Sequence, residues 1–197
     1  FPGIRGGESI ANLLTGDVNP SGHLPISFPS SVGQLPMTYA SLSTGRPMTE
    51  GNKEQKYISR YMDEENDALF VFGHGLSYSS FELVDIEISS LEFSKEDRIK
   101  IKTKVKNTGE YSGRTTIQLY ITDKVAQLAR PVKELKKWAS IFLHKQEETE
   151  LIFELTHEDL SYIHSNLERK TDSGKFVLHI GFSSKDLVEI GEITYID

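Results

Sequence analysis

The chain has no cysteine, one tryptophan and three methionines among its 197 residues. Without cysteine it can form no disulfide bond, no thiolate metal site and no cysteine nucleophile. It also lacks an HExxH motif and a histidine cluster with metal-ligand spacing, so we expect neither a metal nor a cofactor. No apolar run approaches the roughly 18 residues of a membrane-spanning helix, and we expect no membrane partner.

Basic charge is also in deficit, with 22 lysines and arginines against 29 aspartates and glutamates and a net charge of −7. A nucleic-acid-binding face needs an excess of basic residues, so we expect no nucleic-acid partner. The lysines that do cluster, in residues 100–106, alternate with isoleucine, threonine and valine. This period of two is typical of the solvent-exposed face of a strand. The compartment stays open, with the cytoplasm favoured over export.

Residues 1–29 predict one helix and one short strand. A glycine-rich turn leads into a helix that ends at Gly16, and a dense turn then leads into an apolar strand over residues 25–28. A stable domain needs packed layers, so one helix and one strand cannot bury their own apolar faces. We therefore expect their packing partners to lie upstream of Phe1, in a larger protein.

Residues 30–80 form a long, polar segment rich in turn-forming glycine and proline, which we call the linker. A structureless stretch of this length is usually functional or wraps another domain. It closes with aromatic residues around two glycines, in residues 70–78. These aromatics could stack on a sugar, but a packed crossing into the next domain is the favoured interpretation.

Residues 81–197 predict a two-sheet β-sandwich of the immunoglobulin or fibronectin type III kind. About seven short strands separated by turn signals are typical of this fold. The strands are expected near residues 81–88, 99–105, 115–121, 139–143, 149–155, 175–181 and 188–195, with one helical turn at 157–160. Consistent inward parity predicts a core of Ile101, Val105, Leu119, Ile121, Phe153, Phe176 and Ile180.

Five motifs in register carry a resemblance to a known family. They are GDVNPSGHLP at 16–25, FGHGLSY at 72–78, VKNTG at 105–109 with Gly113, QLY at 118–120, and RPVKEL at 130–135. In order and spacing the chain resembles the glycoside hydrolase family 3 β-glucosidases over essentially its whole length. The resemblance implies a (β/α)8-type barrel, an α/β sandwich domain and a fibronectin type III-like domain. Residues 1–29 would end the α/β sandwich domain, and residues 81–197 would form the fibronectin-like domain.

The same resemblance implies that this chain holds no catalytic residue. Retaining β-glucosidases use two carboxyl groups about 5–5.5 Å apart, one as nucleophile and one as acid/base. In the resembled family both precede the segment that corresponds to Phe1, so the upstream catalytic domains would be partners and the chain alone would be inactive on β-glucosides. Glu8 is the one tempting carboxylate, but its place in a first helical turn favours an interaction with the helix N-terminus. A homodimer also stays open.

Arg46 and Tyr57 are the candidate substrate-binding residues. A sugar site combines an aromatic face for the apolar side of a pyranose with donors for its hydroxyl groups. We expect the linker to fold along the upstream domains, where Arg46 and Tyr57 would line the outer part of the pocket. For these two residues, a role in merely holding the linker is an equally good interpretation. For Arg60 and Tyr61 the favoured interpretation is that they clamp the linker to the α/β domain by hydrogen bonds and packing.

An alternative function is a non-catalytic carbohydrate-binding or interaction module. Such a module would present several exposed aromatics on one face of the sandwich. Trp138 and most of the phenylalanines have the apparent parity of core positions, which favours a structural domain. Trp138 is therefore expected to be a core residue or an interdomain plug.

Overall fold

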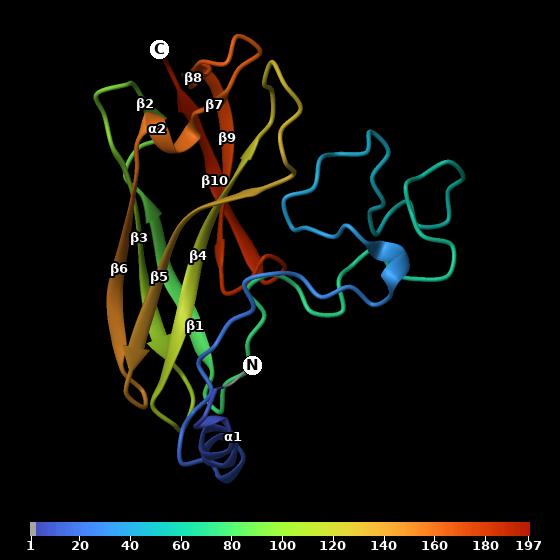
Figure 1. Cartoon of the computed structure of the whole chain (residues 1–197). Coiled ribbons are helices and arrows are strands. Elements are labelled where there is room, and N and C mark those ends of the chain that lie inside the picture. Colours follow the sequence, from blue (N-terminus) through green and yellow to red (C-terminus); the bar gives the residue numbers. More distant parts are fainter. Residues whose placement is uncertain (1–2) are drawn as a thin grey trace.

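The computed structural model describes residues 3–197 and shows a β-sandwich with a helix beneath one end and an irregular segment projecting from one side (Figure 1). Regular strands begin at Phe81, and the described residues before it contain one α-helix and one short 3₁₀ helix over Val32–Gln34. None of the helices in the described residues is long and apolar enough to cross a membrane.

Helix α1 (Gly6–Thr15) ends where the sequence predicted, because Gly16 adopts a left-handed conformation with φ of 82°. Polar contacts hold it to the rest of the chain: the Tyr78 hydroxyl donates to the Leu13 carbonyl at 2.5 Å. Its apolar residues Ile10 and Leu14 stay exposed to solvent. The helix thus presents an apolar face that the described residues do not cover.

The predicted strand over residues 25–28 is wrong. Phe28 makes only an isolated antiparallel bridge with Phe70, through reciprocal N–H to carbonyl bonds of 2.7 and 3.2 Å. A strand needs a neighbouring strand to complete its ladder of hydrogen bonds. The described residues offer this segment a single bridge partner, so it stays irregular.

All seven predicted strands of the sandwich are present, together with the helical turn α2 (His157–Leu160). The seven strands are β1 (Phe81–Ile88), β3 (Ile99–Asn107), β4 (Gly113–Asp123), β5 (Glu134–Leu143), β6 (Glu148–Leu155), β9 (Gly174–Gly181) and β10 (Leu187–Tyr195). Three further strands were not predicted, namely β2 (Glu92–Phe93), β7 (Tyr162–Ile163) and β8 (Arg169–Lys170). Each has two residues, too few to show a periodic pattern.

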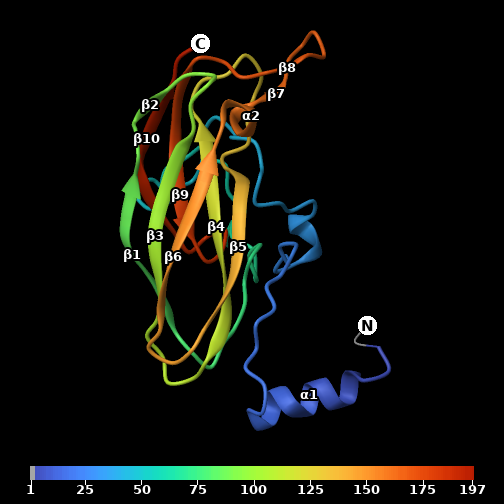
Figure 2. The same ribbon diagram turned by 90° about the vertical axis from the view of Figure 1, so that its left-hand side faces the viewer.

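The strands form two facing sheets, as Figure 2 shows. One sheet has the order β1-β3-β6, and the other has the order β2-β10-β9-β4-β5. A small third sheet pairs β7 with β8. This arrangement confirms the predicted mainly-β, fibronectin type III-like sandwich.

Every predicted core residue is buried between the sheets. Side chains alternate across a strand, so inward positions on paired strands meet: Ile101 pairs with Phe153, and Leu119 pairs with Ile180. The predicted set is at most 6% exposed and comprises Ile101, Val105, Leu119, Ile121, Phe153, Phe176 and Ile180. The periodic pattern therefore identified the apolar cluster that holds the sandwich together.

The outer face of β4 is buried as well, because the linker packs on it. Tyr120 is fully buried, and Tyr39 of the linker lies edge-on to its ring with centroids 5.7 Å apart. Phe72 also stacks on the Tyr39 ring, with ring centroids 4.4 Å apart. Gly73 approaches Gln118 so closely that an added Cβ would lie 2.7 Å from the amide nitrogen. The aromatic segment at 72–78 thus forms a packed crossing, in line with the favoured interpretation.

Trp138 is not a core residue, because its side chain is 65% exposed. It lies on the edge strand β5 opposite Gln118, and both side chains point to the outer face of the sheet. The linker covers Gln118 but leaves Trp138 in solvent. Phe142, four residues along the same strand, is also about half exposed.

Candidate functional site

A cleft separates the sandwich from the outer part of the linker, which we call the linker lobe (residues 41–67). The cleft has a volume of about 700 Å³. Lobe residues that line it include Ser41, Pro47, Met48, Ser59, Arg60, Tyr61 and Asp67. Val132, Lys133, Ser184 and Lys185 line it from the sandwich.

Backbone contacts join the lobe to the loop between β4 and β5. Leu42 and Pro131 form an antiparallel bridge, and the Val132 N–H donates to the Ser41 carbonyl at 2.9 Å. At the other end of the lobe, the Lys185 ammonium donates to the Asp67 carboxylate at 2.5 Å. The lobe is therefore attached to the sandwich at both of its ends.

The cleft is lined by both polar and apolar side chains, and its charged groups are already engaged. Lys133 donates to the Ser184 carbonyl, and burial lowers the pKa of its ammonium. Among the described lining residues Asp67 is the one carboxylate, and it is paired with Lys185. Retaining glycoside hydrolysis needs two carboxyl groups across the scissile bond. The cleft can bind a polar group, but it does not carry that pair.

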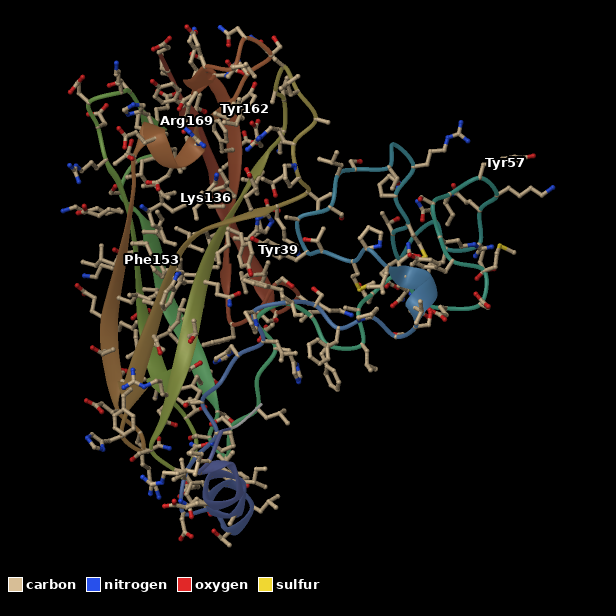
Figure 3. All side chains as sticks on the ribbon, viewed as in Figure 1. Tyr39, Tyr57, Lys136, Phe153, Tyr162 and Arg169 are labelled. Atoms are coloured by element: carbon tan, nitrogen blue, oxygen red, sulfur yellow. The ribbon has the colours of Figure 1, made fainter. Side chains whose placement is uncertain are left out.

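Arg46 and Tyr57 lie on the lobe but not on the cleft. The Arg46 carbonyl accepts a hydrogen bond from the Ser59 N–H at 2.8 Å, which fixes its backbone. Its side chain is exposed and makes no hydrogen bond or ion pair within residues 3–197. Tyr57 has a positive φ of 65° and is 76% exposed. Figure 3 shows it at the tip of the lobe, pointing away from the sandwich.

Arg60 and Tyr61 line the cleft and hold the lobe together. The Arg60 guanidinium donates to the Lys53 carbonyl at 2.5 Å. The Tyr61 N–H donates to the Asn66 side chain at 3.1 Å, and the Asn66 amide donates in turn to the Ser59 carbonyl. These contacts lie within the lobe, and the expected clamp between the linker and the α/β domain stays a prediction.

Glu8 pairs with a neighbouring side chain and not with the free N–H groups of α1. Its carboxylate lies 2.7 Å from the Arg5 guanidinium, and both side chains are largely exposed. It does lie in the first helical turn, where a negative charge is favoured. Within residues 3–197, Glu8 has no partner carboxylate and lines no cleft.

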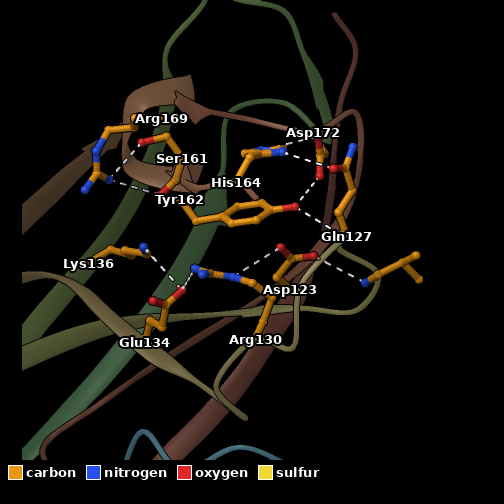
Figure 4. A network of polar contacts seen from close by, with 11 residues as sticks. Asp123, Gln127, Arg130, Glu134, Lys136, Ser161, Tyr162, His164, Arg169 and Asp172 are labelled. Carbon is orange, nitrogen blue, oxygen red and sulfur yellow. Dashed lines mark hydrogen bonds and ion pairs between the residues drawn. The ribbon is translucent and has the colours of Figure 1, made fainter. Parts of the chain in front are cut away.

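A cluster of charged and aromatic side chains at the far end of the sandwich was missed from the sequence (Figure 4). Arg130 lies at its centre, with its guanidinium carbon 4.4 Å from the centre of the Tyr162 ring. The same guanidinium lies 2.5 Å from Glu134 and 3.7 Å from Asp123. The RPVKEL motif at 130–135 marked this region, but the motif alone does not name the partners.

Burial shapes the charges of this cluster. It raises the pKa of Asp123, whose side chain is almost fully buried, despite the nearby Arg130 guanidinium. The Tyr162 hydroxyl donates to Asp172 and accepts from the Gln127 N–H at 3.0 Å, and burial raises its pKa. The cluster ties the loop between β4 and β5 to the hairpin of β7 and β8.

Two protein-family models match the chain in series. The model for the glycosyl hydrolase family 3 C-terminal domain matches residues 1–78. The model for the fibronectin type III-like domain matches residues 115–184. A β-sandwich preceded by this linker is therefore the C-terminal architecture of a glycoside hydrolase.

Several named proteins are similar to almost the whole chain. The protein named "Periplasmic beta-glucosidase" of Salmonella typhimurium is 43% identical over 93% of this chain and 24% of its own length. The protein named "Putative beta-xylosidase" of Formosa agariphila is 37% identical over 92% of this chain and 22% of its own length. The crystal structure of a β-glucosidase from Listeria innocua in complex with isofagomine superimposes with a TM-score of 0.93 at 39% identity. It covers 99% of this chain and 27% of that protein.

The family models and these relatives confirm the resemblance to glycoside hydrolase family 3 that the five motifs carry. The chain spans about a quarter of the length of these relatives. It corresponds to a C-terminal part of such an enzyme.

Proposed function

We propose that this chain acts as the C-terminal region of a retaining β-glucosidase that releases terminal β-D-glucosyl residues from oligosaccharides or glucosides. The main support is similarity over more than nine tenths of the chain to a protein named as a β-glucosidase. The catalytic nucleophile and acid/base would come from upstream domains of the same protein. The chain would support their structure and line the outer substrate pocket.

Two exposed apolar surfaces support a role in packing against upstream domains. One lies on α1, where Ile10 and Leu14 are exposed. The other lies on β5, where Trp138 and Phe142 share the outer face of the edge strand. Exposed apolar residues on neighbouring elements commonly mark an interaction surface. The partner we propose is the catalytic part of the same protein, with a second copy of the chain as the competing occupant.

Within that assembly, Arg46 and Tyr57 would contact the second sugar or aglycone of the substrate. Both side chains are exposed on a lobe whose backbone is tied down by the Arg46–Ser59 hydrogen bond. An arginine with no partner in the described residues can donate to sugar hydroxyl groups, and a tyrosine ring can cover the apolar face of a pyranose. Their position outside the cleft directs the proposed sugar site to the outer side of the lobe.

A β-xylosidase is the second candidate, because the Formosa agariphila protein bearing that name is nearly as similar to the chain. The two activities differ in whether the site accommodates the hydroxymethyl group of glucose. Turnover of an aryl β-glucoside and an aryl β-xyloside by the full-length enzyme would separate them. The isolated chain should hydrolyse neither substrate. Turnover by the chain that one acidic substitution abolishes would contradict the proposed assignment of roles.

The proposed role of Arg46 and Tyr57 is tested in the full-length enzyme. Arg46→Ala and Tyr57→Ala should each weaken kcat/KM for a β-linked disaccharide by about 1–3 kcal/mol in transition-state terms. A small aryl glucoside should be spared, because it offers no second set of sugar hydroxyl groups. Arg60→Ala is the matched control: it removes an arginine whose guanidinium is bound within the lobe, and it should lower stability without changing selectivity. Equal losses on both substrates would mean that Arg46 and Tyr57 hold the linker and not the sugar.

A further inference from the structure

We infer that Arg130 is a positioning residue that sets the place of Arg46, and with it the preference of the enzyme for disaccharides over small glucosides. The inference rests on the proposed function of the linker lobe. Arg130 itself touches neither the lobe nor the proposed sugar site. It acts through the two residues that follow it, Pro131 and Val132, which are the sandwich side of the contact with the lobe.

The sandwich holds the Arg130 side chain in one position. Its side chain is only 15% exposed, and its guanidinium lies flat against the Tyr162 ring between two carboxylates (Figure 4). Glu134 accepts one hydrogen bond from it, and Lys136 approaches the same Glu134 oxygen at 3.4 Å. A planar guanidinium that is both stacked and paired loses most of its freedom. Arg130 therefore marks a rigid point of the loop between β4 and β5.

The position of the Arg130 side chain is unfavourable for stability in one respect. The Nε atom of Arg130 is buried and has no hydrogen-bond partner within the described residues. The Asp123 carboxylate lies 3.7 Å from this Nε atom, which is too far for a good hydrogen bond. A buried donor without a partner is unfavourable, so stability alone does not account for an arginine here. Fixing the loop is the role that the geometry points to.

The two residues after Arg130 contact the start of the lobe. Pro131 bridges to Leu42, and the Val132 N–H donates to the Ser41 carbonyl at 2.9 Å. The Val132 carbonyl is held in turn by the Thr122 hydroxyl at 2.8 Å. The backbone after Arg130 thus acts as a short strand against which residues 41–42 are aligned. Movement of the Arg130 side chain would be transmitted directly to the start of the lobe.

Residues 41–42 lie shortly before Arg46 in the chain. The lobe passes from this contact straight into the turn that carries Arg46, and the Arg46 carbonyl is then anchored by Ser59. Residues 47 and 59 form a bridge next to this anchor, so the turn moves as a unit. Displacing its attachment at Ser41 would shift the Arg46 guanidinium relative to a bound second sugar. A shift of about 1 Å is enough to disturb a positioned catalytic or binding group.

The experiment uses the full-length enzyme and measures kcat/KM for a β-linked disaccharide and for a small aryl β-glucoside. Arg130→Met should lower the disaccharide value about threefold to thirtyfold relative to the aryl value, through a raised KM. Arg130→Lys keeps the charge but loses the flat stacking, so it should rescue only part of the loss. Arg98→Met is the matched control, because Arg98 pairs with Glu154 on the opposite sheet, and it should leave the ratio unchanged.

A double-substitution cycle connects Arg130 to Arg46. Arg130→Met should add little to the selectivity loss of Arg46→Ala, because both act through one guanidinium. If Arg46→Ala changes selectivity while Arg130→Met does not, or if their losses simply add, the inference is overturned and the proposed function stands. If Arg46→Ala leaves selectivity unchanged, the proposed sugar role of Arg46 fails, and this role of Arg130 fails with it. Val132→Pro, which removes the N–H bound to Ser41, decides the matter if Arg130→Met does not fold. It should reproduce the selectivity loss, and an unchanged ratio would overturn the inference.

Discussion

Side chains with opposite parity on neighbouring strands have sharply different environments in this sandwich. Ile101 on β3 is fully buried, while Ile152 on β6 is 47% exposed. Both are isoleucines in strands of the same sheet, and Ile152 pairs with Lys102 on its outer face. Period-two alternation was enough to predict these inward positions, because the geometry of a strand dictates it.

Ile101→Ala should reduce the free energy of unfolding by about 2–5 kcal/mol, because it removes buried methyl groups and leaves a cavity between the sheets. Ile152→Ala is the matched control and should cost much less, since its side chain is about half in water. Urea unfolding followed by circular dichroism measures both variants. Similar effects for the two substitutions would contradict the assigned core.

The prediction that Trp138 is a core residue was wrong, because its residue type alone does not show which face of the strand it occupies. Trp138 was assigned the parity of a core position, although it lies just before the predicted strand over residues 139–143. In the structure β5 begins at Glu134, and alternation along it puts Trp138 on the outer face, opposite Gln118. The partners of Arg130 were equally hidden. Asp123, Tyr162 and Arg130 come together only when separate loops meet at one end of the sandwich. Such long-range contacts leave no local pattern in the sequence.

Strands and helices were predictable when they are long and when their hydrogen-bonding or packing partners lie within this chain. In each of the seven long strands, apolar and polar residues alternate over several positions. The two-residue strands β2, β7 and β8 are too short for such a pattern. Residues 25–28 failed for a different reason, since a strand forms only beside another strand. The linker was correctly predicted to be irregular, but its packing on β4 was not, because Gln118 and Tyr120 have the parity of outward residues.

The crossing of the linker over β4 should be sensitive to substitution at Gly73. This glycine has φ of 81°, and an added Cβ would lie 2.7 Å from the Gln118 amide and 3.0 Å from the Ser183 Cα. Gly45 has nearly the same φ, 79°, but open space around its Cα. Both Gly→Ala substitutions should pay a backbone cost of roughly 1–2 kcal/mol.

Gly73→Ala should therefore cost about 1–3 kcal/mol more than Gly45→Ala, because it also overpacks the crossing. Thermal unfolding of the two variants under the same conditions measures this difference. Loss of protection from hydrogen exchange around residues 72–74 and 183–184 should accompany it. Equal melting temperatures would show that the linker adapts at Gly73 without strain.

At the scale of the whole molecule, the sandwich is self-sufficient while the residues before it are not. The sandwich encloses one apolar cluster between its sheets. By contrast, α1 and the linker lie outside the sandwich (Figure 1) and expose apolar side chains such as Leu14, Val32 and Met62. The relatives are about four times as long as this chain. The exposed surfaces and the length of the relatives together favour the proposed docking against upstream domains.

The outer face of β5 offers the sharpest test of that docking. Trp138→Ser should lower the melting temperature of the full-length enzyme and expose the amides of residues 138–142 to hydrogen exchange, because the indole would lose its cover. Truncating a large aromatic at a well-packed contact commonly costs about 2 kcal/mol or more. Ile152→Ser is the matched control, since Ile152 is a half-exposed apolar residue on the outer face of the opposite sheet. It should have a much smaller effect.

Two other results would identify a different occupant of this face. A dimer that Trp138→Ser converts to a monomer in sedimentation would mean that a second copy of the protein covers β5. Retardation of the protein on a soluble β-glucan gel, abolished by Trp138→Ser, would mean that the strand presents Trp138 and Phe142 to polysaccharide. Either result, or equal effects of the two serine variants on stability, would contradict docking through Trp138. A selective loss of stability in the monomer, without a change in glucan binding, is the outcome that the exposed edge strand leads us to expect.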